Sequence, residues 1–394
     1  MAPGNAGTAQ IACNLNINPM DIGELVKFAQ DEKIDLTLVG PEAPLAKGIS
    51  DQFLIRGMQV FGPTRMATEI ESSKAFAKEL MQKYNIPCAR SASFSDCAEA
   101  KEYVRRQKPP LVIKADGLAA GKGVIIADSV PDALNAVSDF MESKSLGQAG
   151  EKVVIEEHLS GREISSFIFT DGHTALPMVP VSDYKRAFDG DQGPNTGGMG
   201  SYSPPYFFNS ELDKIVNETI MLPTVNAMHD EGRPYRGALY GGLMITDKGP
   251  RVLEFNARFG DPETQVILPR LKTDLLDILL AVVNNQLGEI EIKWSDDACV
   301  GVVMSSGDYP GSYRTGVSIT GLDELDKDIM LFHAGTKTGP NGEILTSGGR
   351  VLTVVATAKA TREAREKVYA NISRLHFEGC HYRNDIARIE EDYT

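Results

Sequence analysis

The residues with the clearest potential for chemistry lie in Leu111–Ala127, where a glycine-rich turn separates two apolar runs. Lys114 and Lys122 stand on either side of Gly117–Gly121. Glycines let backbone N–H groups approach an anion, and lysines supply positive charge for phosphate. A Walker loop requires Ser or Thr where Gly123 stands, and a Rossmann turn requires a helix where a second strand follows. The segment therefore predicts a flap over phosphates between two strands, and an ordinary glycine-rich hairpin is the alternative.

A second chemical centre is Arg251–Gln265, which reads RVLEFNARFGDPETQ. Alternate residues of a strand share a face, so Glu254, Asn256 and Arg258 are expected to point the same way. The oxygens of Glu and Asn suit Mg²⁺, and an arginine can hold a phosphate or carboxylate by two hydrogen bonds. The pattern predicts a metal and anion site. The alternative is the solvent-facing side of an edge strand.

Three further segments carry polar groups that can serve a nucleotide or its substrates. Lys74 stands in the first turn of a predicted helix, Ser72–Tyr84, where the helix dipole disfavours a cation unless an anion is near. Val153–Glu157 is a predicted strand that runs into an acidic stretch suited to ribose hydroxyls. The long glycine-rich segment Tyr184–Gly200 carries both charges, which suits a zwitterionic or phosphorylated substrate, and loops of this length are usually functional. The alternative for Lys74 is a solvated lysine, and the alternative for the acidic stretch after Val153–Glu157 is a plain charged turn.

The composition limits the class of protein that positions these residues. The chain has 394 residues, 42% of them hydrophobic and 24% charged, which allows several domains of ordinary soluble composition. No apolar run approaches the roughly 18–20 residues of a membrane span. The net charge of −14 argues against nonspecific nucleic-acid binding. Five scattered cysteines without a CxxC pair exclude a cysteine-based zinc site and indicate a reducing, cytoplasmic location.

The order of predicted elements indicates an α/β and α+β multidomain protein. In residues 1–70 a helix, Asp21–Gln30, alternates with short strands, Ile34–Val39 and Gln59–Phe61, that end in Gly-Pro turns. This is typical of a doubly wound sheet, here expected to be truncated because the chain starts with a loop-like PGNAG. We expect a central domain over 71–287, with a lid subdomain over about 88–158. A small β-rich domain over 288–394 is expected to contain the strands Ala298–Ser305, Val317–Thr320, Ile329–Ala334 and Arg350–Thr357, followed by a helix, Lys359–Leu375.

Seven motifs in order carry a family resemblance. They are APGNAGT at 2–8, GPEAPL at 40–45, ESSKAFAK at 71–78, VIKADGLAAGKGV at 112–124, GPNTGGMG at 193–200, EFNARFGDPETQ at 254–265 and HAGT at 333–336. Together they resemble the glycinamide ribonucleotide synthetase family (phosphoribosylamine–glycine ligases) of the ATP-grasp superfamily, over essentially the whole chain.

The resemblance implies a monomeric ligase of purine biosynthesis that uses ATP with Mg²⁺ or Mn²⁺ to join glycine to 5-phosphoribosylamine through glycyl phosphate. It implies no nucleic-acid or membrane partner. It assigns catalysis to Arg258 and Lys114, and the metal to Glu254 and Asn256. The implied nucleotide contacts are Lys74, Lys114, Gly121, Gly123, Glu156, Glu157, Leu159 and Glu163. The implied substrate contacts are Asp189, Asp191, Asn195, Thr196, Asp261 and Glu263.

Two departures from the family pattern bear on this prediction. The family opens with a strand, a phosphate-binding turn and a helix, a unit of about 30 residues that is expected ahead of the APGN motif and is missing here. The predicted strand Ala238–Thr246 contains no acid, so a second fully liganded Mg²⁺ is not expected. The alternatives to the main prediction are another ATP-grasp carboxylate–amine ligase, and an ATP-binding but inactive N-terminally truncated remnant.

Overall fold

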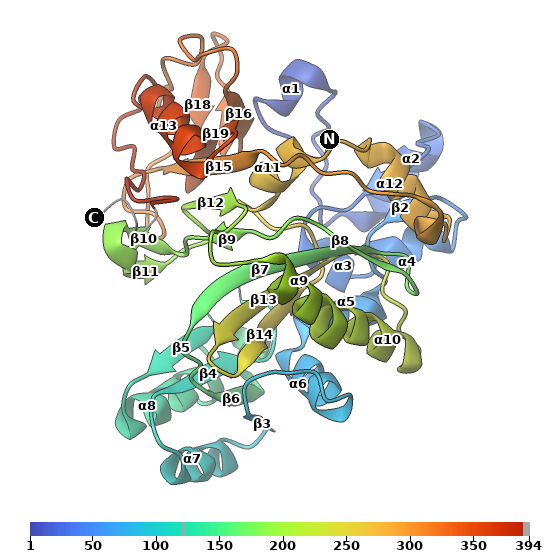
Figure 1. Ribbon diagram of the computed structural model, residues 1–394, viewed down its shortest axis with the longest axis vertical. Coiled ribbons are helices and arrows are strands. Elements are labelled where there is room, and N and C mark those ends of the chain that lie inside the picture. Colours follow the sequence, from blue (N-terminus) through green and yellow to red (C-terminus); the bar gives the residue numbers. More distant parts are fainter. Residues whose placement is uncertain (120–122, 389–394) are drawn as a thin grey trace.

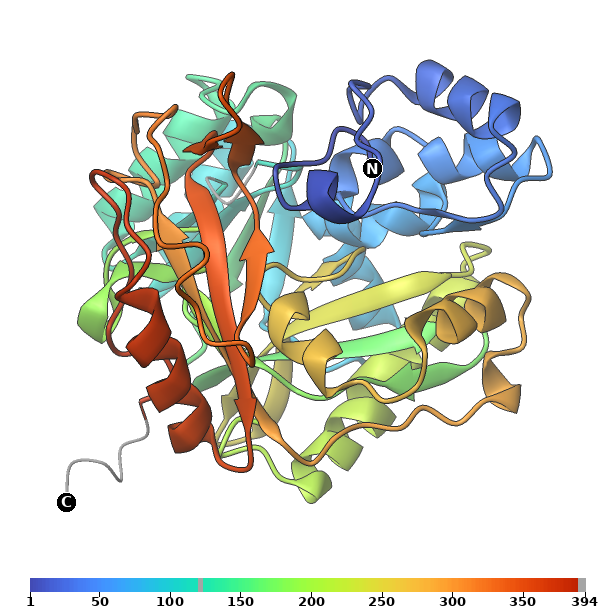
Figure 2. The same ribbon diagram turned by 90° about the horizontal axis from the view of Figure 1, so that it is seen from above.

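The computed structural model describes residues 1–119 and 123–388, and it arranges three sheets of four or five strands, with their helices and smaller strand pairs, around one central region (Figure 1). In Figure 1 the N-terminal region (blue) and the C-terminal strands (orange to red) lie toward the upper end of the molecule, and the lid subdomain (teal) lies at the lower end; Figure 2 shows the N-terminal region and the C-terminal strands side by side. Gly121 and Lys122 of the predicted flap lie outside the described residues. Among the described residues, no helix combines the length and apolarity needed to cross a membrane.

The N-terminal region packs short helices around two parallel strands. Thr37 pairs with Val60, which confirms the parallel arrangement predicted from the Gly-Pro turns. The first strand, Thr37–Leu38, is shorter than the predicted strand Ile34–Val39. Ile34 lies outside the strand, and 41% of its surface is exposed. The elements are α1 (Thr8–Ile11), α2 (Ile22–Asp31), β1 (Thr37–Leu38), α3 (Glu42–Ala46), α4 (Ile49–Leu54), β2 (Val60–Phe61) and α5 (Arg65–Ser72).

The lid subdomain is a four-stranded antiparallel sheet in the order β3-β6-β4-β5, with two helices packed on it. Lys114 pairs with Val124, so the flap joins neighbouring strands, as predicted. The preceding helix begins where the sequence indicates, since the Ser73 side chain accepts a hydrogen bond from the N–H of Phe76. The elements are α6 (Lys74–Lys83), β3 (Ser91–Phe94), α7 (Cys97–Arg106), β4 (Leu111–Ala115), β5 (Val124–Ala127), α8 (Val130–Met141), η1 (Gly147–Gly150) and β6 (Val153–Glu157).

The central sheet, in the order β14-β13-β7-β8, is buried on both faces. On β7, Ile164 and Ile168 pack with α6 and α10, whereas Phe167 and Phe169 pack with α12, which follows the two-residue period of a strand. The elements are β7 (Arg162–Thr170), β8 (Ala175–Pro177), α9 (Ser210–Val216), the π-helical turn Asn217–Met221, α10 (Leu222–Asp230), β13 (Gly237–Thr246), β14 (Gly249–Asn256), α11 (Thr264–Ile267), η4 (Leu268–Arg270), α12 (Leu275–Val283) and η5 (Leu287–Glu289).

The third sheet, in the order β16-β19-β15-β12-β9, contains strands from both sides of the predicted boundary after residue 287. The predicted strand Val317–Thr320 was wrong, because this segment makes only single bridges to Leu345 and His376. The elements are β9 (Ser182–Asp183), β10 (Arg186–Phe188), η2 (Asp189–Asp191), β11 (Gln192–Asn195), β12 (Gly200–Ser203), β15 (Ala298–Ser305), β16 (Met330–His333), β17 (Thr336–Thr338), β18 (Ile344–Thr346), β19 (Arg350–Ala358) and α13 (Thr361–Ile372).

Candidate active site

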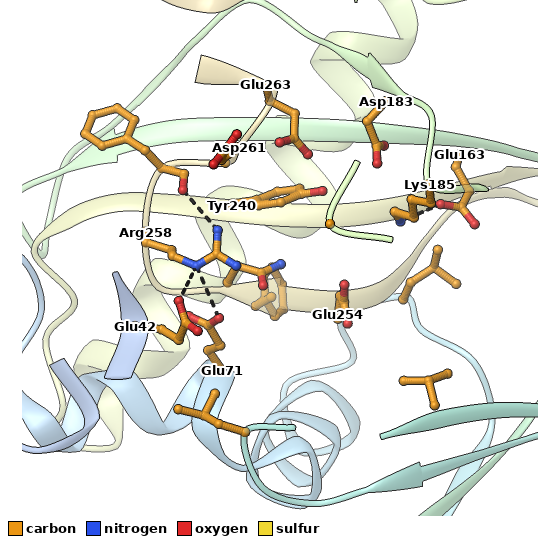
Figure 3. Close-up of a pocket in the computed structure, with 18 of the residues that line it drawn as sticks. Glu42, Glu71, Glu163, Asp183, Lys185, Tyr240, Glu254, Arg258, Asp261 and Glu263 are labelled. Atoms are coloured by element: carbon orange, nitrogen blue, oxygen red, sulfur yellow. Dashed lines mark hydrogen bonds and ion pairs between the residues drawn. The ribbon is translucent and has the colours of Figure 1, made fainter. Parts of the chain in front are cut away.

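A cavity of about 1120 Å³ lies where four parts of the molecule meet. Its wall takes Glu42 from the N-terminal region, Lys114 from the lid, Glu254 from the central sheet and Arg350 from the C-terminal strands. Figure 3 shows the charged side chains that converge on it. A cleft between domains is a usual place for a substrate site.

Glu254 is the carboxylate around which the cations of the cavity gather. Burial disfavours its charge, but attraction from Lys185, Lys114 and Lys74 outweighs burial and lowers the pKa of Glu254 below its usual value. Asn256 lies two residues further along β14 and also lines the cavity. The structure therefore brings the two predicted metal ligands to one wall, with the carboxylate ionised.

Lys114 is held in the cavity wall by polar groups from two other strands. It is 6% exposed, and its Nζ donates to the Leu253 carbonyl at 2.9 Å and lies 3.1 Å from Glu156 Oε1. Lys78 Nζ lies 3.0 Å from the other oxygen of Glu156. The Glu156 side chain thus has two cationic neighbours, and its carboxylate points toward lysines rather than outward.

Lys74 joins the start of α6 to the base of the flap. Its Nζ donates to the Gly117 carbonyl at 3.1 Å, and burial lowers the pKa of this lysine. Asp116 accepts from the N–H of Ala75 at 2.7 Å and from the Ser73 hydroxyl at 3.1 Å. The charge of Glu254, and more weakly that of Asp116, opposes this shift of the Lys74 pKa and supplies the anion that a lysine in a first helical turn requires. The bonds of Asp116 and Lys74 fix the flap base and the helix to each other.

The predicted nucleoside-binding residues lie together at one end of the cavity. Glu156, Glu157, Leu159 and Glu163 all line it, as does Gly123 at the end of the flap. Glu157 is paired with Arg90, whose Nη2 lies 2.7 Å away, and Glu163 is paired with Lys185 at 2.6 Å.

Arg258 lies beyond the end of β14, so strand alternation does not orient it; two carboxylates from other segments do. Its Nε is 2.8 Å from Glu42 Oε2 and 3.6 Å from Glu71 Oε1, and its Nη1 donates to the Phe259 carbonyl at 3.1 Å (Figure 3). Glu71 also accepts from the N–H of Ala257 at 2.6 Å. Burial raises the pKa of Glu71 to about 7, although the charge of Arg258 opposes that shift. Sequence reasoning missed both carboxylates, although each stands in a motif that it singled out.

Four of the six predicted substrate residues line the cavity: Asn195, Thr196, Asp261 and Glu263. Burial, helped by the charge of nearby Asp183, raises the pKa of Glu263 to about 7. The structure does not bring Asp189 and Asp191 to the cavity. Their carboxylates instead bind Asn384 and Arg383 of the C-terminal segment.

Sequence reasoning also missed Asp183, Tyr240 and Arg350 as cavity residues, and it gave Lys185 no role beyond the mixed charge of Tyr184–Gly200. The charges of Asp183 and Glu163 overcome the effect of burial and raise the pKa of Lys185 well above its usual value. Arg350 donates to the Asp261 carbonyl at 2.7 Å and to its Oδ2 at 3.0 Å. Within the part of the chain that the structure describes, no cluster of three or more His, Cys, Asp or Glu could hold a metal ion by itself.

Comparison with known proteins supplies a family for this arrangement. Three models of phosphoribosylglycinamide synthetase match: the N domain at residues 1–71, the ATP-grasp (A) domain at 72–264 and the C domain at 299–389. The phosphoribosylamine–glycine ligase of Halalkalibacterium halodurans is 50% identical over 387 residues, which cover 98% of this chain and 90% of that protein. That of Escherichia coli K12 is 47% identical over 390 residues, covering 98% and 91%.

Solved structures agree with this assignment. The phosphoribosylamine–glycine ligase of Thermotoga maritima matches with a TM-score of 0.85 and 35% identity, over 98% of this chain and 93% of that one. The biotin carboxylase domain of the Hydrogenobacter thermophilus 2-oxoglutarate carboxylase, with a TM-score of 0.74 and 15% identity over 96% and 83% of the two chains, shares the fold.

The chain belongs to the phosphoribosylglycinamide synthetase family, and the predicted family and ATP-grasp fold are confirmed. The predicted shortening of its start stays a prediction.

Proposed function

We propose that this member of the phosphoribosylglycinamide synthetase family joins glycine to 5-phosphoribosylamine in the cavity, with cleavage of ATP to ADP and phosphate, as a step of purine biosynthesis. One observation carries the proposal: an ionised carboxylate, Glu254, lies among Lys74, Lys114, Lys185 and Arg258 in a large interdomain cavity. Phosphoryl transfer depends mainly on positioning and on neutralising charge, and this set of residues is built for both.

The reaction has two steps. A carboxylate oxygen of glycine attacks the γ-phosphorus of ATP, the bond from that phosphorus to the β-γ bridging oxygen breaks, and ADP leaves. The amine nitrogen of phosphoribosylamine then attacks the carbonyl carbon of glycyl phosphate, the carbon–oxygen bond to phosphate breaks, and the nitrogen loses a proton. The products are the amide, ADP and phosphate.

The lysines serve the nucleotide. Lys74 and Lys114, at the two edges of the flap base, contact the phosphates and offset the charge that shifts between them during transfer. Lys185 contributes a third positive charge from the opposite wall. By family analogy, the backbone of Glu156 and Leu159 holds adenine, and Glu157 or Glu163 accepts from ribose hydroxyls.

Glu254 and Asn256 fit Mg²⁺ in chemical type. Both offer the hard oxygen ligands that this ion prefers, and the lowered pKa of Glu254 keeps its carboxylate charged. Two protein ligands suffice for an ion that keeps waters and nucleotide phosphates as its other ligands. Bound there, Mg²⁺ would neutralise phosphate charge.

Arg258 and the residues around it serve the acid and the amine. Arg258 holds the carboxylate of glycine and then the acyl phosphate, while Asn195, Thr196, Asp261 and Glu263 face glycine and the sugar phosphate. The flap that ends at Gly123 closes to exclude water, because an acyl phosphate hydrolyses when wet.

The test measures ADP with the purified chain, ATP and Mg²⁺, adding glycine and phosphoribosylamine singly and together. The amine is formed in the assay from ribose 5-phosphate and ammonia, and mass spectrometry identifies the amide. The proposal expects ADP and amide in equal amounts only with both substrates. Faster turnover with β-alanine than with glycine would indicate another ligase, and the absence of ADP under every condition would indicate a remnant.

The use of Mn²⁺, the monomeric state and the domain boundaries after residues 70 and 287 remain predictions.

A further inference from the structure

We infer that the C-terminal segment His381–Ala387, called the clamp below, is a positioning element of the active site, with Arg383 at its centre. The clamp fixes the backbone of Tyr184–Asp191, the segment that carries Lys185 into the cavity. This inference rests on the proposed function, because it concerns the same phosphate-binding residues. The clamp does not line the cavity, so its effect on the reaction is exerted through Lys185.

Arg383 is a fully paired buried cation. Its side chain is 1% exposed, and its guanidinium lies 4.9 Å from the ring centroid of Tyr184. Nη1 donates to the Arg186 carbonyl at 3.0 Å and to Asp191 Oδ1 at 2.9 Å. Nε and Nη2 donate to the two oxygens of Asp385 at 2.7 and 2.6 Å. A buried charge with this many partners holds its neighbours in one arrangement, because breaking any pair leaves a charge uncompensated.

Neighbouring clamp residues bind the same loop at further points. The N–H of Asn384 donates to Asp189 Oδ1 at 2.8 Å, and Asp385 Oδ2 accepts from the N–H of Gly190 at 2.8 Å. The Nε2 atom of His381 lies 2.8 Å from the Ala187 carbonyl oxygen. The C-terminal segment therefore binds two carbonyls, one amide and two carboxylates of the loop.

The loop needs this support because its own backbone is strained. Asp191 has a φ of 54°, a left-handed conformation that non-glycine residues seldom adopt. Such a residue persists where surrounding contacts determine it, and here the carboxylate of Asp191 is bound to Arg383. The side chain of Asp191 is 71% exposed, and among the described residues it pairs only with Arg383 of the clamp.

On its other side, the same segment forms the cavity wall. Lys185 Nζ lies 2.6 Å from Glu163, and the Lys185 carbonyl accepts from both the N–H and the hydroxyl of Thr196, at 2.7 and 2.9 Å. Loosening the clamp would therefore move Lys185 and Thr196 together. Lys74 and Lys114 belong to α6 and β4, which the clamp does not contact through any hydrogen bond within the described residues.

The experiment compares Arg383→Met, Lys185→Met and the double variant in the ligase assay, at matched folded content by circular dichroism. A displacement of a catalytic group by about 1 Å can lower the reaction rate up to 100-fold. We therefore expect Arg383→Met, which would displace Lys185, to lower kcat about tenfold. We expect the KM for ATP to change less than about twofold, because Lys74 and Lys114 stay in place. In the Lys185→Met background, Arg383→Met is expected to have little further effect, since the clamp acts on the reaction through the position of the Lys185 side chain.

Arg374→Met is the matched control. Arg374 also pairs with an aspartate of the C-terminal region, Asp326 at 2.8 Å, but within the described residues it forms no hydrogen bond or ion pair with Tyr184–Asp191, so kcat is expected to stay unchanged. If Arg383→Met does not fold, the exposed partner variant Asp191→Asn replaces it, with an expected decrease of about threefold in kcat. Restoration of kcat by Arg383→Lys above the level of Arg383→Met would support the clamp further.

Two outcomes would overturn the inference: a folded Arg383→Met enzyme with normal kcat, or an equal decrease in kcat with and without Lys185. An inactive wild-type chain would instead overturn the proposed function. The two failures are therefore distinguishable.

Discussion

The two ends of the cavity are built in different ways. At the phosphate end, each charge stands on a regular helix or strand. Lys74 belongs to α6, Lys114 to β4 and Glu254 to β14. At the substrate end, defined by Glu42, Arg258, Asp261 and Arg350, side chains from distant segments hold one another by ion pairs (Figure 3). The first end depends on local structure, and the second on how three regions of the chain meet.

This difference explains which residues the sequence could reveal. A lysine beside a glycine-rich turn, or a Glu and an Asn two apart on a strand, expresses its chemistry within one element. The partners Glu42 and Glu71 lie 216 and 187 positions before Arg258, and no periodicity connects them to it. The account predicts that substitutions at the phosphate end abolish ATP use, whereas substitutions at the substrate end spare ATP binding and slow the transfer.

The largest effect is expected from Glu254→Gln. Loss of the carboxylate removes the charged metal ligand, and we expect kcat to fall about 1000-fold, at the upper range for removal of one electrostatic group. The measurement is ADP release at saturating substrates. Glu218→Gln, which removes an exposed carboxylate paired with Lys214, is the control and should keep full activity. Full activity of Glu254→Gln would refute the metal assignment.

The next effect is expected from Lys114→Met, with Lys74→Met beside it. Each variant loses a charge that faces the phosphates, so kcat/KM for ATP should fall about 100-fold. Steady-state kinetics with varied ATP measures this. If the KM for glycine rises instead while kcat/KM for ATP is unchanged, the two ends of the cavity have been assigned the wrong way round.

A smaller effect is expected from Glu42→Gln at the substrate end. Arg258 would lose its charged partner in the N-terminal region, and kcat should decrease about tenfold while the KM for ATP stays within about twofold. The exposed Glu32 in the same region provides the matched control, Glu32→Gln. A large increase in the KM for ATP on Glu42→Gln would contradict the division of the cavity into two ends.

The smallest effect on the reaction is expected from Glu71→Gln. The main effect of this substitution is expected on the free energy of unfolding. Burial raises the pKa of Glu71 to about 7, so between pH 4.5 and 7 the folded chain binds more protons than the unfolded chain. The free energy of unfolding therefore decreases as pH rises through this window, by on the order of 3 kcal/mol for this group. Urea unfolding of the ligand-free proteins should show that the free energy of unfolding decreases less between pH 5 and pH 8 in Glu71→Gln than in the wild type. An identical decrease in both proteins would contradict this account.

Much of the fold could be predicted from the sequence, because helix caps and the spacing of apolar residues act within a single helix or strand. α6 lies within the predicted helix Ser72–Tyr84 and is capped by Ser73, and the flap joins β4 to β5 as expected. The segment Val317–Thr320 is apolar enough to predict a strand, but it finds no ladder of partners. Its neighbours in the C-terminal region satisfy it by isolated bridges, which no local pattern reveals.

The prediction for Asp189 and Asp191 shows the same limit within the site. Their place in a glycine-rich, charged segment predicts substrate contacts, yet their carboxylates are bound by Asn384 and Arg383, almost 200 residues later. Lys185, in the same segment, reaches the cavity instead. Charge composition identified the right segment, and only the tertiary contacts determine which of its charges faces the cavity.

One isotope measurement tests the central claim, that the phosphate end activates the carboxylate of glycine before the substrate end delivers the amine. The wild-type chain is given ATP, Mg²⁺, phosphoribosylamine and glycine labelled with ¹⁸O in both carboxylate oxygens, and the released phosphate is analysed by mass spectrometry. The account predicts that each phosphate carries one ¹⁸O, because the attacking oxygen leaves glycine with the phosphoryl group. Phosphate without ¹⁸O, released alongside the amide, would contradict it.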